Sequence, residues 1–138
     1  MRLPDWEPRL RAAIMDARPK LGAWGTNDCG TFVLVDCVTA VLGTSPLSQY
    51  VGTYDTAEGA AELVNQLTDG GGFDMEALAR KYFAAKEPAT AIDGDIGVVE
   101  LQSIKTLVIV HGACVFAPGE RCQARLPRTA LIAAFGVD

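Results

Sequence analysis

Apolar residues recur at helical spacing early in the chain. The positions with this spacing are Trp6, Leu10, Ala13, Ile14 and Ala17. They predict an amphipathic helix over about residues 5–18, which Pro19 would end. A nearly all-apolar run then begins near Asp28 and stops at Gly43, and either Asn27 or Asp28 can cap its start. Its β-branched residues also suit a strand, but its length and its end signals favour a helix, and a helix that is apolar on every side is a buried one.

Two more helices are expected before the pattern changes. Thr56 precedes "AEGAAELVNQL", and the glycines at 70–72 end that segment. Asp74 can cap a fourth helix within "FDMEALARKYFAA", residues 73–85. These segments place four helices in the first part of the chain.

After Pro88 the chain consists of short runs rich in β-branched and aromatic residues. The runs are "GDIGVVEL", "KTLVIVHG", "ACVFA", "RCQARL" and "IAAFGV", and "APGER" is a turn signal between two of them. Helices followed by antiparallel strands define an α+β fold. We therefore expect one domain over 1–138, with a helical half at about 1–87 and a sheet half at about 88–138.

Composition narrows the possible functions. The chain has 138 residues, of which 49% are hydrophobic and 21% charged, as in globular domains. A formal net charge of -5 argues against broad binding to nucleic-acid backbones. No window reaches the roughly 18 apolar residues that a membrane span needs. The charged N-terminal stretch lacks the apolar core of a signal peptide, so we expect no signal for export.

The four cysteines do not predict a metal centre. They lie at positions 29, 37, 114 and 122, without the C-x-x-C spacing of a zinc site, and His111 is the only histidine. We expect no metal and no cofactor. Four free thiols are favoured, because cytosolic thiols stay reduced, and a disulfide between Cys114 and Cys122 is the alternative.

Cys29 is the candidate nucleophile. At the start of a helix, free N–H groups and a partial positive charge would lower its pKa and could receive an oxyanion. The neighbouring Asp28 carboxylate would act in the opposite direction. The alternative is a small buried residue, since free cysteine is often buried. Cys37, two turns later, is expected in the core, and Asp36 at the solvent edge of the helix.

A cysteine nucleophile needs a base, which is normally histidine. The only histidine in the chain is His111, at the end of "KTLVIVHG". The alternative is a histidine with no catalytic role at a strand end. Gln123 and Asp95 are candidates for orienting the imidazole.

Several motifs together resemble a known family. "W-G-x-x-D-C-G" at residues 24–30 resembles the nucleophile turn of NlpC-type cysteine peptidases, and "GDIGVV" at 94–99 resembles the strand that follows their helical half. "VGTYDTAEGA" at 51–60 and "LPRTALIAAFGV" at 126–137 are similar to a compact branch encoded by tailed phages and gene-transfer agents. The similarity extends over almost the whole chain.

This resemblance implies a papain-like fold, with a buried central helix packed on a C-terminal antiparallel sheet. It implies a tail-associated protein, located in the virion tail or in the host cytoplasm during assembly. Its partners would be other phage tail proteins and peptidoglycan peptides. Cys29 would attack a peptide carbonyl, and His111 would act as base and then as acid.

The chain also departs from the family pattern. Aligning "LVIV" with the strand that follows the family histidine puts Thr106 at the histidine position and the third polar residue near Pro118. Aligning "HGACV" at 111–115 instead restores His111. In the first register, neither the histidine nor the third polar residue of the family site is present. This register therefore predicts a structural or assembly protein of the tail with a degenerate site. The second predicts an active peptidase. A third hypothesis is an unrelated cytosolic acyl-transfer or thiol enzyme on the same fold.

Overall fold

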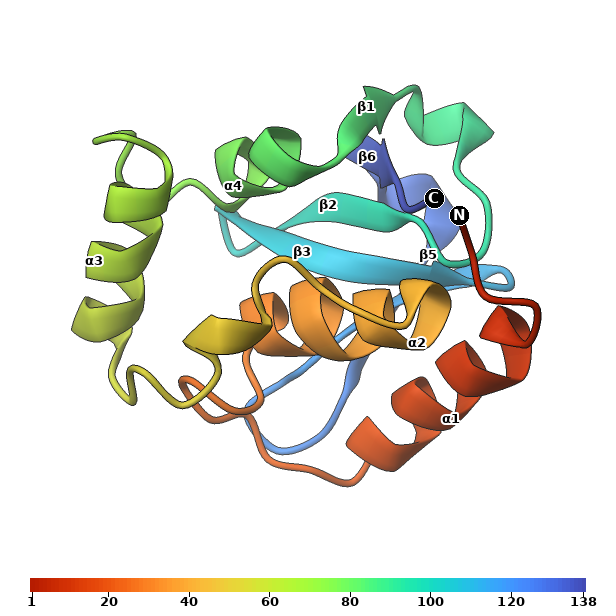
Figure 1. Ribbon diagram of the computed structural model, residues 1–138, viewed down its shortest axis with the longest axis horizontal. Helices are drawn as coiled ribbons and strands as arrows, with labels where there is room; N and C mark the ends of the chain where they lie inside the picture. The colour runs from red at the N-terminus through yellow and green to blue at the C-terminus, as the bar shows by residue number, and fades with distance from the viewer.

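Helices precede an antiparallel sheet in the computed structural model, which describes all residues 1–138 (Figure 1). The helical segments are α1 (Trp6–Ala17), η1 (Gly30–Cys37), α2 (Val38–Leu42), η2 (Ser48–Tyr50), α3 (Ala57–Leu67) and α4 (Met75–Tyr82). The α+β class and the four predicted helical regions are confirmed, because η1 and α2 together form the second one. No helix is long and apolar enough to cross a membrane.

The sheet has six strands in the order β1-β6-β2-β3-β4-β5, and every pair is antiparallel. The strands are β1 (Ala84–Lys86), β2 (Ile96–Leu101), β3 (Ile104–His111), β4 (Cys114–Ala117), β5 (Ala124–Pro127) and β6 (Ala133–Gly136). The short helices η3 (Pro88–Thr90) and η4 (Arg128–Ala130) connect them. The five predicted strands are confirmed. The prediction that the fourth helix runs to residue 85 is wrong, because its last residues form β1 along β6.

The buried helix begins with π-helical turns. η1 is wound as a π-helix and continues directly into α2, which ends at Gly43 with φ of +89°. The left-handed conformation at the end of α2 is one that glycine adopts without the steric cost of a Cβ atom. The predicted boundaries of this helix are confirmed, and the π-helical winding is an addition to the prediction.

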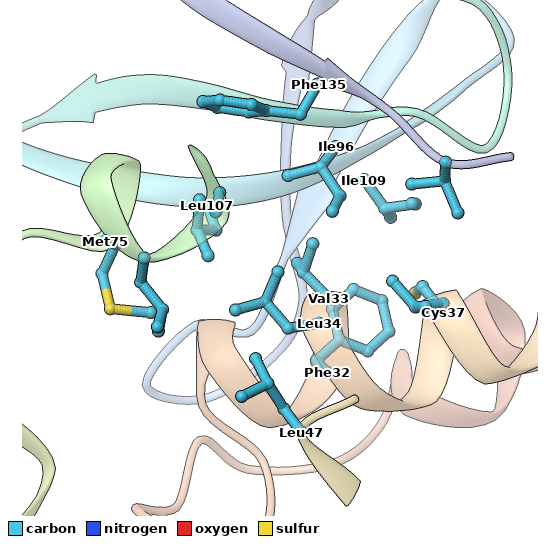
Figure 2. Close-up of a cluster of buried hydrophobic side chains, with 14 of the residues drawn as sticks. Phe32, Val33, Leu34, Cys37, Leu47, Met75, Ile96, Leu107, Ile109 and Phe135 are labelled. Atoms are coloured by element: carbon cyan, nitrogen blue, oxygen red, sulfur yellow. The ribbon is translucent and has the colours of Figure 1, made fainter. Parts of the chain in front are cut away.

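The main core lies between this helix and the sheet. Phe32, Val33 and Leu34 of η1 are 0 to 1% exposed and pack toward β2, β3 and β6 (Figure 2). Cys37 is fully buried in the same cluster, as predicted. In Figure 1 this helix runs along β3, with α1 beside it and α3 at the periphery of the molecule. The N-terminal end of the buried helix is therefore held against the sheet.

The two faces of β3 contribute to two different clusters. Leu107 and Ile109 belong to the main core, whereas Val108 and Val110 belong to a second cluster that includes residues of β2 and β4. Because side chains alternate along a strand, Thr106 shares the face of Val108. His111 shares the helix-facing side of Leu107. These assignments decide which part of β3 can meet Cys29.

Asp95, directly before β2, contacts both ends of the chain. Its side chain is fully buried, and its carboxylate contacts Arg2 Nη2 at 3.0 Å and Lys86 Nζ at 2.7 Å. It also accepts hydrogen bonds from the backbone N–H groups of Ile92 and Val137. With both oxygens occupied in this way, Asp95 has a structural role in the packing of the termini.

Candidate functional site

Cys29 lies in the first turn of the buried helix, which Asp28 caps. Asp28 Oδ1 accepts a hydrogen bond from the Thr31 N–H at 2.8 Å, and Thr31 Oγ1 accepts one from the Asp28 N–H at 3.0 Å. This reciprocal pairing satisfies N–H groups that a helix start leaves free. Of the two predicted caps, Asn27 and Asp28, the structure uses Asp28. Cys29 itself is half-buried, and its thiol is close enough to β3 to interact with the backbone of Leu107.

The second oxygen of Asp28 joins two motifs that are far apart in the sequence. Asp28 Oδ2 accepts hydrogen bonds from the Gly25 N–H at 2.8 Å and from the Tyr54 hydroxyl at 2.7 Å. Gly25 has φ of +87°, and a Cβ atom there would lie 1.9 Å from the Tyr54 carbonyl oxygen. The conformation of the turn before Cys29 therefore depends on its contacts with the segment around Tyr54.

The rest of the segment 51–60 holds Tyr54 in this position. The Gly52 N–H donates to the Gly25 carbonyl at 2.9 Å. Thr56 caps α3 by accepting a hydrogen bond from the Gly59 N–H at 3.0 Å. A Cβ atom on Gly59 would lie 3.1 Å from the Tyr54 Cβ, so the small residue permits this close approach. These contacts around the cysteine turn explain the glycine, tyrosine and threonine positions of the segment "VGTYDTAEGA" at residues 51–60.

An open cleft of about 430 Å³ lies in front of Cys29. Four segments line it: the cysteine turn, the start of α4, the start of β3 and the loop between β4 and β5. The lining residues fall at 22–24, 27–29, 73, 75, 104–106 and 118–120. The Gly22 N–H donates to the Gly119 carbonyl at 3.0 Å and joins two of these segments. The volume is sufficient for a small ligand or for a few side chains.

The Cys29 thiol is not activated in this setting. Burial raises its pKa to about 11, backbone groups led by that of Leu107 act to lower it, and the Asp28 carboxylate raises it further. The loss of solvation outweighs the favourable backbone groups. The predicted lowering by N–H groups of the helix start is present, at Cys29 and Gly30, but burial outweighs it, so the prediction of a lowered pKa for Cys29 is wrong. The predicted opposing influence of Asp28 is confirmed.

Tyr54 stays protonated beside the same carboxylate. Burial is the main cause that raises its pKa, and the hydrogen bond to Asp28 adds to this. A protonated hydroxyl is the donor that the contact with Asp28 requires. The sequence motif contained Tyr54, but nothing in the sequence assigned it a partner.

The structure does not bring His111 and Cys29 together. His111 pairs with Cys114 at the last position of β3 and does not line the cleft. It lies five residues beyond Thr106, which corresponds to about 16 Å along a strand. Thr106 and Pro118 do line the cleft. However, Thr106 belongs to the strand face that carries Val108, and the group of β3 that interacts with the thiol is the backbone of Leu107.

The remaining candidate residues lie outside the cleft. Gln123 donates a hydrogen bond from Nε2 to the Ile14 carbonyl at 3.0 Å, which connects the loop before β5 to α1. Asp95 is held by Arg2 and Lys86, and neither Gln123 nor Asp95 contacts His111. Asp36 is exposed, as predicted. All four cysteines are free thiols.

No group of three histidine, cysteine, aspartate or glutamate side chains is close enough to hold a metal ion. The fold and the site thus define an α+β protein with a capped cysteine turn at an open cleft. The chain belongs to the family described as Domain of unknown function (DUF6950), which matches residues 1–137. No curated protein and no solved structure gives a significant match.

Proposed function

We propose that this protein is a structural or assembly component of a phage-type tail. It would have a papain-like, NlpC-type fold in which the catalytic site is degenerate. The observation that carries the proposal is the Cys29 thiol, which is protonated in a cleft whose lining contains no imidazole. A cysteine peptidase needs a thiolate and a neighbouring base, and this cleft provides neither.

The placement of the cysteine supports the papain-like assignment. A buried helix carries Cys29 at its start and packs on the antiparallel sheet beside β3. The W-G-x-x-D-C-G turn and the G-D turn before β2 occur in the order of the family that they resemble. The proposed tail association is supported by the similarity of these motifs and of segment 51–60 to the compact branch of tailed phages.

The alternative of an active peptidase requires a rearrangement. His111 would have to leave its pairing with Cys114, and β3 would have to shift so that His111 replaces Leu107 beside the thiol. Such a shift would move buried residues of β3 out of two core clusters. Burial of these apolar side chains stabilises the present register, so the non-catalytic reading is the better supported one.

The catalytic part of the proposal is tested by peptidoglycan hydrolysis. The wild-type chain, Cys29→Ala and the exposed-cysteine control Cys122→Ala are incubated with purified peptidoglycan, and released amines are quantified. We expect no release that depends on Cys29. Release by the wild type and by Cys122→Ala, but not by Cys29→Ala, would establish the peptidase instead.

The structural part is tested on particles. Antibody against the chain should detect it in tails purified from particles of a strain that carries the gene, at a constant ratio to a major tail protein. Absence from the particles and from tail assembly intermediates would contradict the tail role.

A further inference from the structure

Charge is strongly segregated along the chain. Residues 21–79 contain no lysine and no arginine, so all 12 basic residues lie outside this stretch. The acidic residues within it are Asp28, Asp36, Asp55, Glu58, Glu62, Asp69, Asp74 and Glu76. The cysteine turn and the start of α4, which form two walls of the cleft, both belong to this acidic stretch. These two walls of the cleft therefore contribute acidic side chains and no basic ones.

The charged groups of the cleft itself agree with this. Lys105 is its only cation, and its Nζ lies 3.2 Å from Glu76 Oε1, while Glu76 Oε2 lies 2.8 Å from Arg80. Glu120 is exposed at the cleft and forms no ion pair. Lys105 and Arg80 share the single carboxylate of Glu76, so these three groups carry a net charge of +1. Asp28 and Glu120 add two negative charges, which leaves a net charge of -1 at the cleft, with the Glu120 carboxylate available to a ligand.

Large apolar side chains surround these charges. Trp24 is 43% exposed, Phe73 46% and Ile104 60%, and all three line the cleft. Met75, which is 5% exposed, also contributes to its lining. Exposed aromatic and aliphatic groups gathered in one concave surface indicate a binding site. Aromatic rings beside carboxylates favour a cation, through both the ring quadrupole and the charge.

We infer that the cleft binds an extended segment of a partner protein that carries an arginine or lysine next to a large apolar side chain. The apolar side chain would contact Trp24, Phe73 and Ile104, and the cation would approach Glu120. This inference rests on the proposed non-catalytic role, since it uses the cleft as a docking site. Peptides rich in free carboxylates would be repelled by the same surface.

The inference is tested by selection followed by titration. Short random peptides displayed on a carrier are selected on the wild-type chain, after removal of those that bind the Trp24→Ala variant. We expect the selected peptides to be enriched in arginine or lysine adjacent to leucine, phenylalanine or tryptophan. Enrichment of acidic or purely polar peptides, or no enrichment, would overturn the inference.

Matched charge variants then locate the site. Glu120→Lys should weaken binding of a selected peptide by about five- to tenfold, because an attractive charge becomes a repulsive one. Glu62→Lys makes the same change on an exposed position of α3 outside the cleft, and it should leave affinity within about twofold. Phe73→Ala should cost about tenfold or more, as expected for a central aromatic contact.

Equal losses of peptide affinity in Glu120→Lys and Glu62→Lys would overturn the assignment of the site. Self-association of the chain in ultracentrifugation that the selected peptide abolishes would also overturn the inference, because the cleft would then bind a second copy of the chain. Failure of the proposed function has a different signature. It appears as Cys29-dependent release of amines from peptidoglycan, whichever peptides bind.

Discussion

At Cys29, two physical effects act on one thiol in opposite directions. Backbone groups favour the thiolate, while burial and the Asp28 carboxylate favour the neutral thiol, and their sum places the pKa at about 11. Position at a helix start is therefore insufficient to predict reactivity. The extent of burial has to be known as well, and it depends on residues such as Leu107 that are distant in sequence.

Gly25 shows how closely the cysteine turn fits its neighbour. A Cβ atom at this position would overlap the Tyr54 carbonyl oxygen and would also require an unfavourable left-handed conformation. We predict that Gly25→Ala lowers the free energy of unfolding by at least about 2 kcal/mol. Urea denaturation followed by circular dichroism measures this.

The matched control is Gly52→Ala. Gly52 also has a positive φ, but a Cβ atom there would have no heavy atom within 4 Å. Its cost should be limited to the backbone conformation, about 1 kcal/mol. Equal losses for the two variants would show that the contact between Gly25 and Tyr54 has no energetic importance.

At the scale of elements, local signals predicted most boundaries. Caps at Asp28, Thr56 and Asp74 lie immediately before three of the helical segments. Short runs rich in β-branched and aromatic residues, divided by turn signals, predicted β2 to β6. β1 was missed because Ala84 and Ala85 have helical propensity, and their strand conformation depends on pairing with Phe135 and Gly136. Such distant pairing leaves no local signal.

The site was harder to predict than the elements. The sequence identified Cys29, the cap at Asp28 and the importance of segment 51–60. It could not decide the face and the register of β3, because Thr106 and His111 are both consistent with a strand. It also gave no indication that Phe73, in the loop before α4, and Ile104, at the start of β3, would meet at one cleft.

The capping hydroxyl of α3 carries an element-scale prediction. Thr56→Ala removes the acceptor for the Gly59 N–H, and we expect a loss of about 1 kcal/mol together with faster hydrogen exchange in α3. Thr26→Ala is the control, because Thr26 is exposed and its hydroxyl makes no hydrogen bond. Unchanged exchange in α3 of Thr56→Ala would contradict the role of the cap.

At the scale of the whole molecule, Asp95 connects the N-terminus, β1 and the C-terminus. Its fully buried carboxylate contacts Arg2, which is 13% exposed, and Lys86, which is 28% exposed. Removing the negative charge would leave two largely covered cations without a partner, which is costly in a protein interior. Asp95, in the turn before β2, is therefore expected to stabilise the packing of both termini, independently of any binding function.

We predict that Asp95→Asn lowers the free energy of unfolding by about 3 kcal/mol. The control is Glu7→Gln, which removes an exposed carboxylate 3.6 Å from Arg11 and should change stability by less than about 0.5 kcal/mol. Urea midpoints of the two variants provide the comparison. A loss at Asp95→Asn no larger than that of Glu7→Gln would refute this assignment.

The central claim, that Cys29 is a protonated and non-catalytic thiol, is tested most directly by its alkylation rate as a function of pH. Iodoacetamide modification of Cys29 is followed by peptide mass spectrometry in the wild type and in His111→Ala. Only the thiolate reacts, so a pKa of about 11 leaves roughly one thiol in ten thousand reactive at pH 7. We predict slow labelling near neutrality, a rate that rises up to about pH 11, and the same profile in both proteins. Rapid labelling near neutrality that is lost in His111→Ala would contradict the account.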